Sequence, residues 1–127
     1  MTMEKIMRNN MAAVVLEGTE VVIWDTQSAL DLMMTVQYET GCSRLALSKQ
    51  QIAEAFFDLR TGLAGEILQK FVNYRMKLAI YGDFSVYTSK ALRDFIYESN
   101  QGREICFAGD RETALDWLLR SDTSPAV

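Results

Sequence analysis

The sequence predicts an α/β domain with a mixed, mostly parallel sheet, an N-terminal β-hairpin and about four packed helices. One observation on the sequence and one general rule of chain topology predict it. Short apolar, often β-branched runs alternate with longer segments in which apolar residues recur every three or four positions. Strands that alternate with helices are joined by right-handed crossovers, which make neighbouring strands parallel. We expect one domain over residues 1–120 and a disordered tail over residues 121–127, where the single proline lies.

The first third of the chain predicts a hairpin, a short strand and a helix. Two half-apolar runs within Met3–Gly18 flank Asn9 and Asn10, and asparagine tolerates the positive φ of tight hairpin turns. Val21–Trp24 is β-branched and aromatic, which favours a further short strand. Apolar residues at imperfect helical spacing then predict a helix over Gln27–Thr40.

The remainder of the chain predicts repeated strand–helix units. Ser48 and Gln51 have capping-box spacing, which favours a helical turn or a short helix over Lys49–Leu59. Gly65 predicts close packing of its helix against a neighbour. We expect Met76–Ala79 to be central in the sheet. The expected strands are Arg44–Leu47, Met76–Tyr81 and Glu104–Ala108, and the expected helices are Leu63–Tyr74, Ser89–Asn100 and Arg111–Leu119.

Charge and composition exclude several classes of protein. The formal net charge is −4 and the basic residues are scattered singly, so we expect no nucleic-acid surface. The first ten residues lack the apolar core of a signal peptide, and runs such as Ala12–Leu16 are too short to span a bilayer. Cys42 and Cys106 match no paired spacing and predict free thiols in a reducing compartment. We therefore expect a cytoplasmic protein without membrane contact.

The sequence contains no histidine. This removes the commonest general base, the Ser-His-Asp and Cys-His arrangements, and most zinc sites. An enzyme would have to rely on carboxylates alone, for example Asp58 with Asp83 or Asp110. We expect no catalytic residue, no metal and no cofactor.

Three aspartates follow expected strands: Asp25, Asp83 and Asp110. Ligands of open α/β sheets meet the carboxyl ends of the parallel strands, and clustered carboxylates there would suit Mg²⁺. The simpler interpretation is that each aspartate caps the N-terminus of the helix that follows it. We favour the caps.

The connection Asp83–Lys90 is the most polar in the sequence. Ser85 and Ser89, together with Lys90 at the start of a helix, have the chemistry to hold an anion or a phosphate. An ordinary loop that ends in a Ser89 cap explains the same residues. Both interpretations stay open at this point.

A second candidate region combines two aromatics with a Thr-Gly turn that opens a helix. Phe56 and Phe57 precede Asp58, Arg60 and Thr61. One interpretation is core packing plus a Thr61 N-cap. The other is a hydroxyl displayed at a helix N-terminus, where an added phosphate is electrostatically favoured and changes the surface.

Two resemblances follow from these residues. Phe56–Arg75, with Tyr81–Ser85 and Asp94–Asn100, resembles a bacterial family of domains of unknown function over nearly the whole chain, and that family implies no activity. More loosely, the order of elements is similar to STAS domains, the fold of anti-sigma-factor antagonists. There an Asp-Ser-Ser-Gly-Leu motif opens a helix, and a partner kinase phosphorylates its second serine. Thr61 corresponds to that serine, whereas Leu59 and Arg60 depart from the motif.

Three functions compete. The first is a non-enzymatic regulatory or protein-interaction module with an unidentified protein partner, and a homodimer is also allowed. The second is a small-ligand binder that uses the Asp83–Lys90 loop and the strand ends. The third is an enzyme built on carboxylates. A pocket with paired carboxylates would favour the enzyme, and an apolar patch around Leu63 and Phe84 would favour a protein partner.

Overall fold

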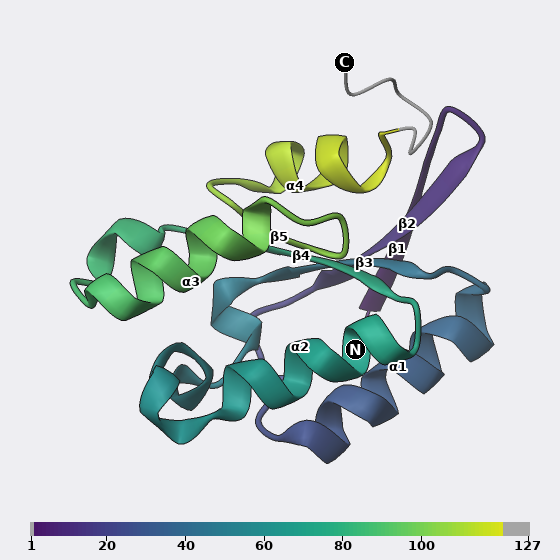
Figure 1. Ribbon diagram of the computed structural model, residues 1–127. Helices are drawn as coiled ribbons and strands as arrows, with labels where there is room; N and C mark the ends of the chain where they lie inside the picture. Colours follow the sequence, from purple (N-terminus) through teal and green to yellow (C-terminus); the bar gives the residue numbers. More distant parts are fainter. Residues whose placement is uncertain (1, 121–127) are drawn as a thin grey trace.

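A five-stranded sheet forms the middle layer of the computed structural model, which describes residues 2–120 (Figure 1). The strand order is β1-β2-β3-β4-β5; β1 is antiparallel to β2, and the other neighbours are parallel. The predicted fold class is therefore confirmed. The tail expected over 121–127 lies outside the described residues. The strands are β1 (Thr2–Arg8), β2 (Met11–Glu17), β3 (Arg44–Ser48), β4 (Lys77–Tyr81) and β5 (Ile105–Ala108).

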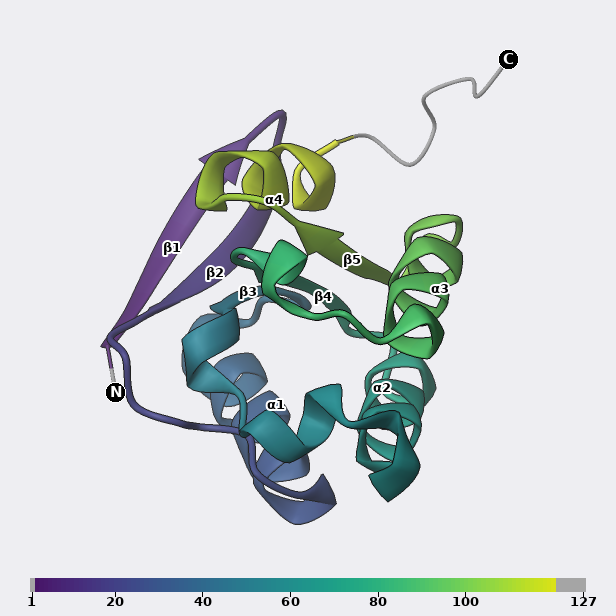
Figure 2. The same ribbon diagram turned by 90° about the vertical axis from the view of Figure 1, so that its left-hand side faces the viewer.

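Helices cover both faces of the sheet unequally. Three helices lie on one face and α4 lies alone on the other (Figures 1 and 2). This follows from the strand order, because successive right-handed crossovers in one direction place their helices on the same face. The helices are α1 (Thr26–Thr40), α2 (Leu63–Asn73), α3 (Lys90–Asn100) and α4 (Arg111–Leu118).

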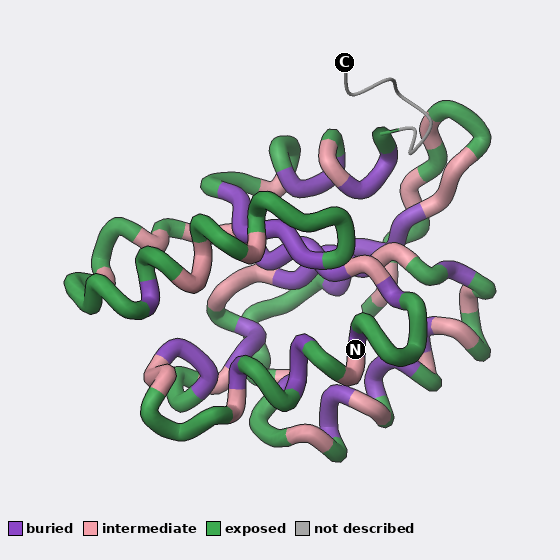
Figure 3. The backbone as a smooth tube through the Cα atoms, in the orientation of Figure 1, coloured by how far each residue is buried: buried purple, intermediate pink, exposed green. Residues whose placement is uncertain are grey.

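The two faces of the sheet differ in side-chain size. Large residues such as Leu47 and Ile80 point to α1, α2 and α3, whereas Ala46 and Ala79 point to α4. Figure 3 shows the buried inner strands between the layers of helices. Small side chains let the single helix α4 approach the sheet closely, so that eight residues suffice to cover that face.

The hairpin forms as predicted. Asn9 and Asn10 have φ of 54° and 63°, the positive values that a two-residue hairpin turn requires. Arg8 next to the turn binds α4 through Glu112 (2.7 Å) and Asp116 (2.9 Å). The hairpin is thereby attached to the helix that covers the same face.

Two expectations about single elements are wrong. Val21–Trp24 is no strand: Ile23 forms only an isolated parallel bridge to Ile52, because the chain leaves the sheet here to reach α1. A Cβ at Gly65 would meet nothing within 4 Å, so this glycine serves no close packing in the chain.

Other expectations hold. β4 lies inside the sheet between β3 and β5, parallel to both, although β3 is the middle strand of the five. The helical turn expected over Lys49–Leu59 is present as a series of short 3₁₀ turns, and Gln51 accepts from the Ser48 N–H at 2.8 Å, as one half of the expected capping box requires. Cys42 and Cys106 are buried free thiols. Among residues 2–120, none of the helices has the length and apolar character needed to cross a bilayer.

The hairpin turn gives a direct test of the register. Asn10→Val should lower the free energy of unfolding by about 1–2 kcal/mol, because a β-branched residue is strained at positive φ. Asn10→Gly should not lower it, because glycine adopts that φ freely. Urea unfolding of both variants checks this. Equal unfolding free energies of Asn10→Val and Asn10→Gly would mean that residue 10 does not adopt a positive φ.

Candidate functional site

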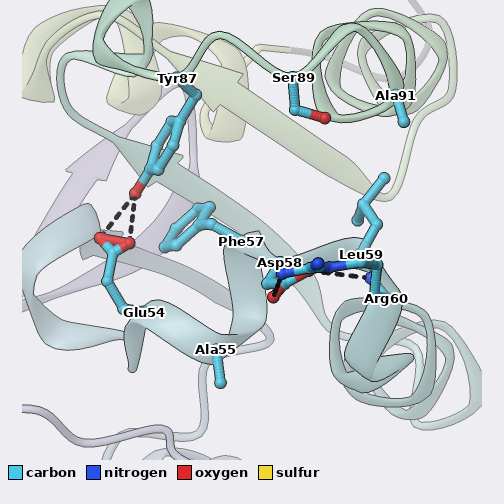
Figure 4. Close-up of a pocket in the computed structure, with 9 residues that line it drawn as sticks. All are labelled: Glu54, Ala55, Phe57, Asp58, Leu59, Arg60, Tyr87, Ser89 and Ala91. Carbon is cyan, nitrogen blue, oxygen red and sulfur yellow. Dashed lines mark hydrogen bonds and ion pairs between the residues drawn. The ribbon is translucent and has the colours of Figure 1, made fainter.

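Two connections meet beyond the carboxyl ends of β3 and β4. One consists of the 3₁₀ turns that lead from β3 to α2, and the other runs from β4 through a 3₁₀ turn over Phe84–Val86 to α3. A pocket of about 650 Å³ opens between them (Figure 4). We call it the Phe57–Tyr87 cleft. It is lined by Glu54, Ala55, Phe57, Asp58, Leu59, Arg60, Tyr87, Ser89 and Ala91.

A stacked aromatic pair forms the back of the cleft. The rings of Phe57 and Tyr87 have centroids 5.2 Å apart and are inclined by 19°. Phe57 is buried and also contacts Phe56 and Phe84, and Phe84 packs edge-on against Phe107 of β5. The core interpretation of the two phenylalanines is confirmed, and Phe57 additionally lines the cleft. The aromatic wall of the cleft is therefore part of the hydrophobic core.

Tyr87 holds the two connections together. Its hydroxyl donates to the Glu54 carboxylate at 2.8 and 2.9 Å (Figure 4). Burial and the hydrogen bond to Glu54 raise the pKa of Tyr87, so its phenol stays protonated and remains a donor at neutral pH. Sequence reasoning missed Glu54 and Tyr87 as a pair, because they lie 33 positions apart and no local pattern joins them.

Lys49 adds a second link, and Gly82 makes room for it. Lys49 Nζ lies 4.6 Å from the centroid of the Tyr87 ring and donates to the carbonyl oxygen of Asp83 at 3.0 Å. A Cβ on Gly82 would come within 2.8 Å of Lys49 Cβ. Glycine at this position thus permits the approach of the two loops.

Asp58 and Arg60 form a bidentate pair at the cleft. Arg60 Nε and Nη2 donate to the two carboxylate oxygens, each at 2.9 Å, and the Arg60 backbone N–H donates to one of them at 3.1 Å. The hydrogen bonds from Arg60 lower the pKa of Asp58, which is therefore ionised at neutral pH. The Arg60 side chain is 90 % exposed. Because the ion pair is open to solvent, another anion can easily replace Asp58 as the partner of Arg60.

Thr61 closes the turn that carries Asp58 and Arg60. Its hydroxyl donates to the carbonyl oxygens of Ala55 (2.9 Å) and Asp58 (2.8 Å) and accepts from the Leu63 N–H (3.2 Å). The expected position at the opening of α2 is confirmed. The expected N-cap role is wrong, because the cap residue is Gly62 in the left-handed conformation with φ of 73°.

The Asp83–Lys90 connection follows its ordinary-loop interpretation. Asp83 accepts hydrogen bonds from the N–H and the hydroxyl of Ser85, and these lower the pKa of Asp83. Ser89 caps α3 by accepting from the Leu92 N–H at 3.2 Å, and Lys90 pairs with Asp94 at 2.7 Å. Of the residues predicted in this stretch, Ser89 lines the cleft, whereas Asp83, Ser85 and Lys90 lie outside its lining.

Asp25, Asp83 and Asp110 act as caps, as expected. Asp25 accepts from the Ser28 N–H at 2.7 Å and Asp110 from the Thr113 N–H at 2.8 Å, in addition to Asp83 at its own turn. Within residues 2–120, no three acidic or sulfur side chains come together in the manner of a metal site.

An exposed apolar patch around Leu63 and Phe84 would favour a protein partner. Both residues are only partly exposed and pack against the main core. The apolar lining of the cleft consists of Phe57, Leu59 and Ala91. Leu59 points toward Ala91, whereas Phe57 stacks on Tyr87 (Figure 4).

Comparisons with known proteins found one family. The model of a domain of unknown function (DUF4180) matches residues 8–118, from the end of β1 to the end of α4. Neither the curated proteins nor the solved structures contain a match to this chain. The expected resemblance to a family of unknown function is confirmed, and the function has to be argued from the site.

Thr61 variants test the closure of the turn. Thr61→Val should lower the free energy of unfolding by about 1 kcal/mol, because it leaves its hydrogen-bond partners unpaired. Thr61→Asp should cost at least as much, since a carboxylate donates no proton and faces two carbonyl oxygens. Thr61→Ser should be nearly neutral. Denaturant unfolding measures all three, and a Thr61→Asp variant as stable as wild type would contradict this geometry.

The low pKa values of Asp58, Asp83 and Asp110 predict a pH dependence of stability. A carboxyl whose folded pKa lies below its unfolded value, about 3.9, stabilises the fold fully above that value. The contribution is lost as pH falls through the folded pKa. Unfolding free energy should therefore fall on acidification below about pH 4, and Asp110→Asn should flatten the slope. An unchanged slope in this variant would mean that Asp110 is not a cap.

Proposed function

We propose that this chain, which belongs to the family of domains of unknown function DUF4180, is a non-enzymatic, cytoplasmic regulatory module that recognises a protein partner through the Phe57–Tyr87 cleft. One observation carries the proposal. Two connections that the sequence singles out for different reasons line the same cleft, with Asp58 and Arg60 from one and Ser89 from the other.

The chemistry of the cleft suits an apolar side chain of a protein. Its walls are apolar at Phe57, Leu59 and Ala91, and the charged groups of Glu54 and Arg60 belong to the same lining. Anchor pockets at protein interfaces combine an apolar centre with a polar rim in this way. The aromatic wall needs no rearrangement on binding, because the core already holds it.

Thr61 supplies a means of regulation. A phosphate on its hydroxyl would remove the proton donated to Ala55 and Asp58 and place negative charge beside their carbonyl oxygens. The turn that would open also carries Leu59 and Arg60, which line the cleft. The looser resemblance to STAS domains, in which Thr61 takes the place of the phosphorylated serine, supports the same role.

The titratable groups of this region favour a role other than catalysis. A general acid at neutral pH needs a raised carboxyl pKa, whereas hydrogen bonds lower the pKa of Asp58, Asp83 and Asp110. Each of these carboxylates caps its own turn. The sequence has no histidine to act as a base instead.

A small-ligand binder is the second candidate. The volume of the cleft, about 650 Å³, lies in the range typical of small-molecule sites. The exposed Arg60 guanidinium could exchange Asp58 for a ligand carboxylate or phosphate, with the nearby Ser89 as a further polar contact.

Affinity purification from the native host tests the proposal. Wild type and three variants serve as baits: Ala91→Arg to fill the cleft, Thr61→Glu to mimic the phosphate, and Glu98→Arg as an exposed control elsewhere on α3. A partner of the cleft should bind wild type and Glu98→Arg, and Ala91→Arg should lose it. Thr61→Glu should bind it more weakly. Circular dichroism checks that all four proteins are folded.

Two results would contradict the proposal. Recovery of the same partners by Ala91→Arg and wild type would remove the cleft from recognition. If no bait recovers a partner, but a metabolite raises the melting temperature of wild type and not of Ala91→Arg, the small-ligand candidate replaces the regulatory one.

A further inference from the structure

The connection between β2 and α1 contains an apolar run, Val21–Trp24, but lies outside the sheet (Figure 2). Val21–Trp24 has the composition of a strand, yet only Ile23 is fully buried. Val21 is 47 % exposed and Trp24 is 57 % exposed. The composition of this run favours burial in a strand, but the fold leaves most of the run exposed. Such disagreements between local sequence and fold are typical of functional positions.

The backbone holds Trp24 in a defined place. On one side, the Ile23 carbonyl oxygen accepts from the Ala53 N–H at 2.8 Å. On the other side, the Trp24 N–H donates to Ser28 Oγ at 2.9 Å, within the capping arrangement of α1. The exposed indole is thus attached to a fixed backbone, which lowers the entropy that binding would cost.

The exposed apolar surface continues along α1. Met34 and Tyr38 are 44 % and 92 % exposed, and Asp31 and Tyr38 lie about two helical turns apart on one face. A groove of about 310 Å³ lies between α1 and the connection, with Val22 and Leu32 among its lining. We define the Trp24 face as Glu20, Val21, Trp24, Asp31, Met34 and Tyr38.

Negative charge is concentrated in the same part of the chain. Between Arg8 and Arg44 there are five acidic residues and no lysine or arginine, whereas acidic and basic residues nearly balance in the rest of the sequence. Glu20 and Asp31 line the groove. Neither of them takes part in an ion pair within residues 2–120. The groove therefore has a negative potential without internal compensation.

From this combination we propose that the Trp24 face binds a basic, amphipathic segment of a protein partner. The apolar side of such a segment would cover Val21 and Trp24, and its lysines or arginines would pair with Glu20 and Asp31. Tryptophan is also the best aromatic contact for a cation. This binding is separate from the Phe57–Tyr87 cleft, whose lining shares no residue with the groove.

Two other occupants fit the face poorly. Membrane surfaces in cells are commonly anionic and would repel Glu20 and Asp31. A second copy of the chain, bound face to face about a two-fold axis, would bring the same acidic residues of both copies together. A basic partner has neither penalty.

Fluorescence anisotropy with a labelled peptide tests the inference. The probe is an 18-residue helical peptide of leucine and lysine, lysine on one face, and a leucine–glutamate peptide of the same spacing is the control probe. Trp24→Ala and the double variant Glu20→Lys with Asp31→Lys should each weaken binding by about tenfold or more. Glu98→Lys, an exposed acid on α3, and Ala91→Arg in the cleft should change it by less than about twofold.

Three outcomes would overturn the inference. Equal loss of binding with Glu98→Lys would mean that net charge alone attracts the peptide. Equal binding of the leucine–glutamate peptide would mean that charge plays no part. Binding of the wild type, but not of Trp24→Ala, to vesicles of phosphatidylcholine and phosphatidylglycerol would assign the face to a membrane surface.

Discussion

The handedness of the crossovers is the constraint on which the rest of the structure depends. Parallel strands laid down in order from β2 to β5, each joined by a right-handed crossover, place α1, α2 and α3 on one face and leave α4 alone on the other. They also bring every strand-to-helix connection to one edge of the sheet. Both surfaces for which we infer a function include residues of those connections, because this edge is where backbone is free of the sheet, and each continues onto a helix.

The two faces of the sheet carry different side chains, in keeping with the three helices on one face and the single helix on the other. Leucine and isoleucine fill the space below three helices, whereas alanines below α4 let one short helix cover the sheet. The cleft is built as an extension of the larger core. Phe57 belongs to both, so the wall is rigid, while the rim at Arg60 is exposed and exchangeable. A fixed apolar wall beside an open charged rim is a suitable arrangement for recognition.

Local signals were sufficient for most of the fold and for Asp58, Arg60 and Ser89 among the residues that line the cleft. Alternating periods predicted the strands and helices, and Asp25 and Asp110 were recognisable as caps from their positions. The prediction of a strand over Val21–Trp24 was wrong. A β-branched and aromatic composition favours a strand, but it does not show whether a neighbouring strand is close enough to pair with. The pairing of Tyr87 with Glu54 depends on two loops meeting in space, which single-sequence patterns do not encode.

Site-specific photo-crosslinking in the native host tests most directly whether the cleft is a recognition surface. A benzophenone side chain replaces Leu59 in the cleft, and in a second strain it replaces Glu98 on α3. If the cleft binds a protein partner, irradiation should yield a defined adduct with another protein from position 59 and none from position 98. The absence of an adduct at position 59, or identical adducts from both positions, would contradict it.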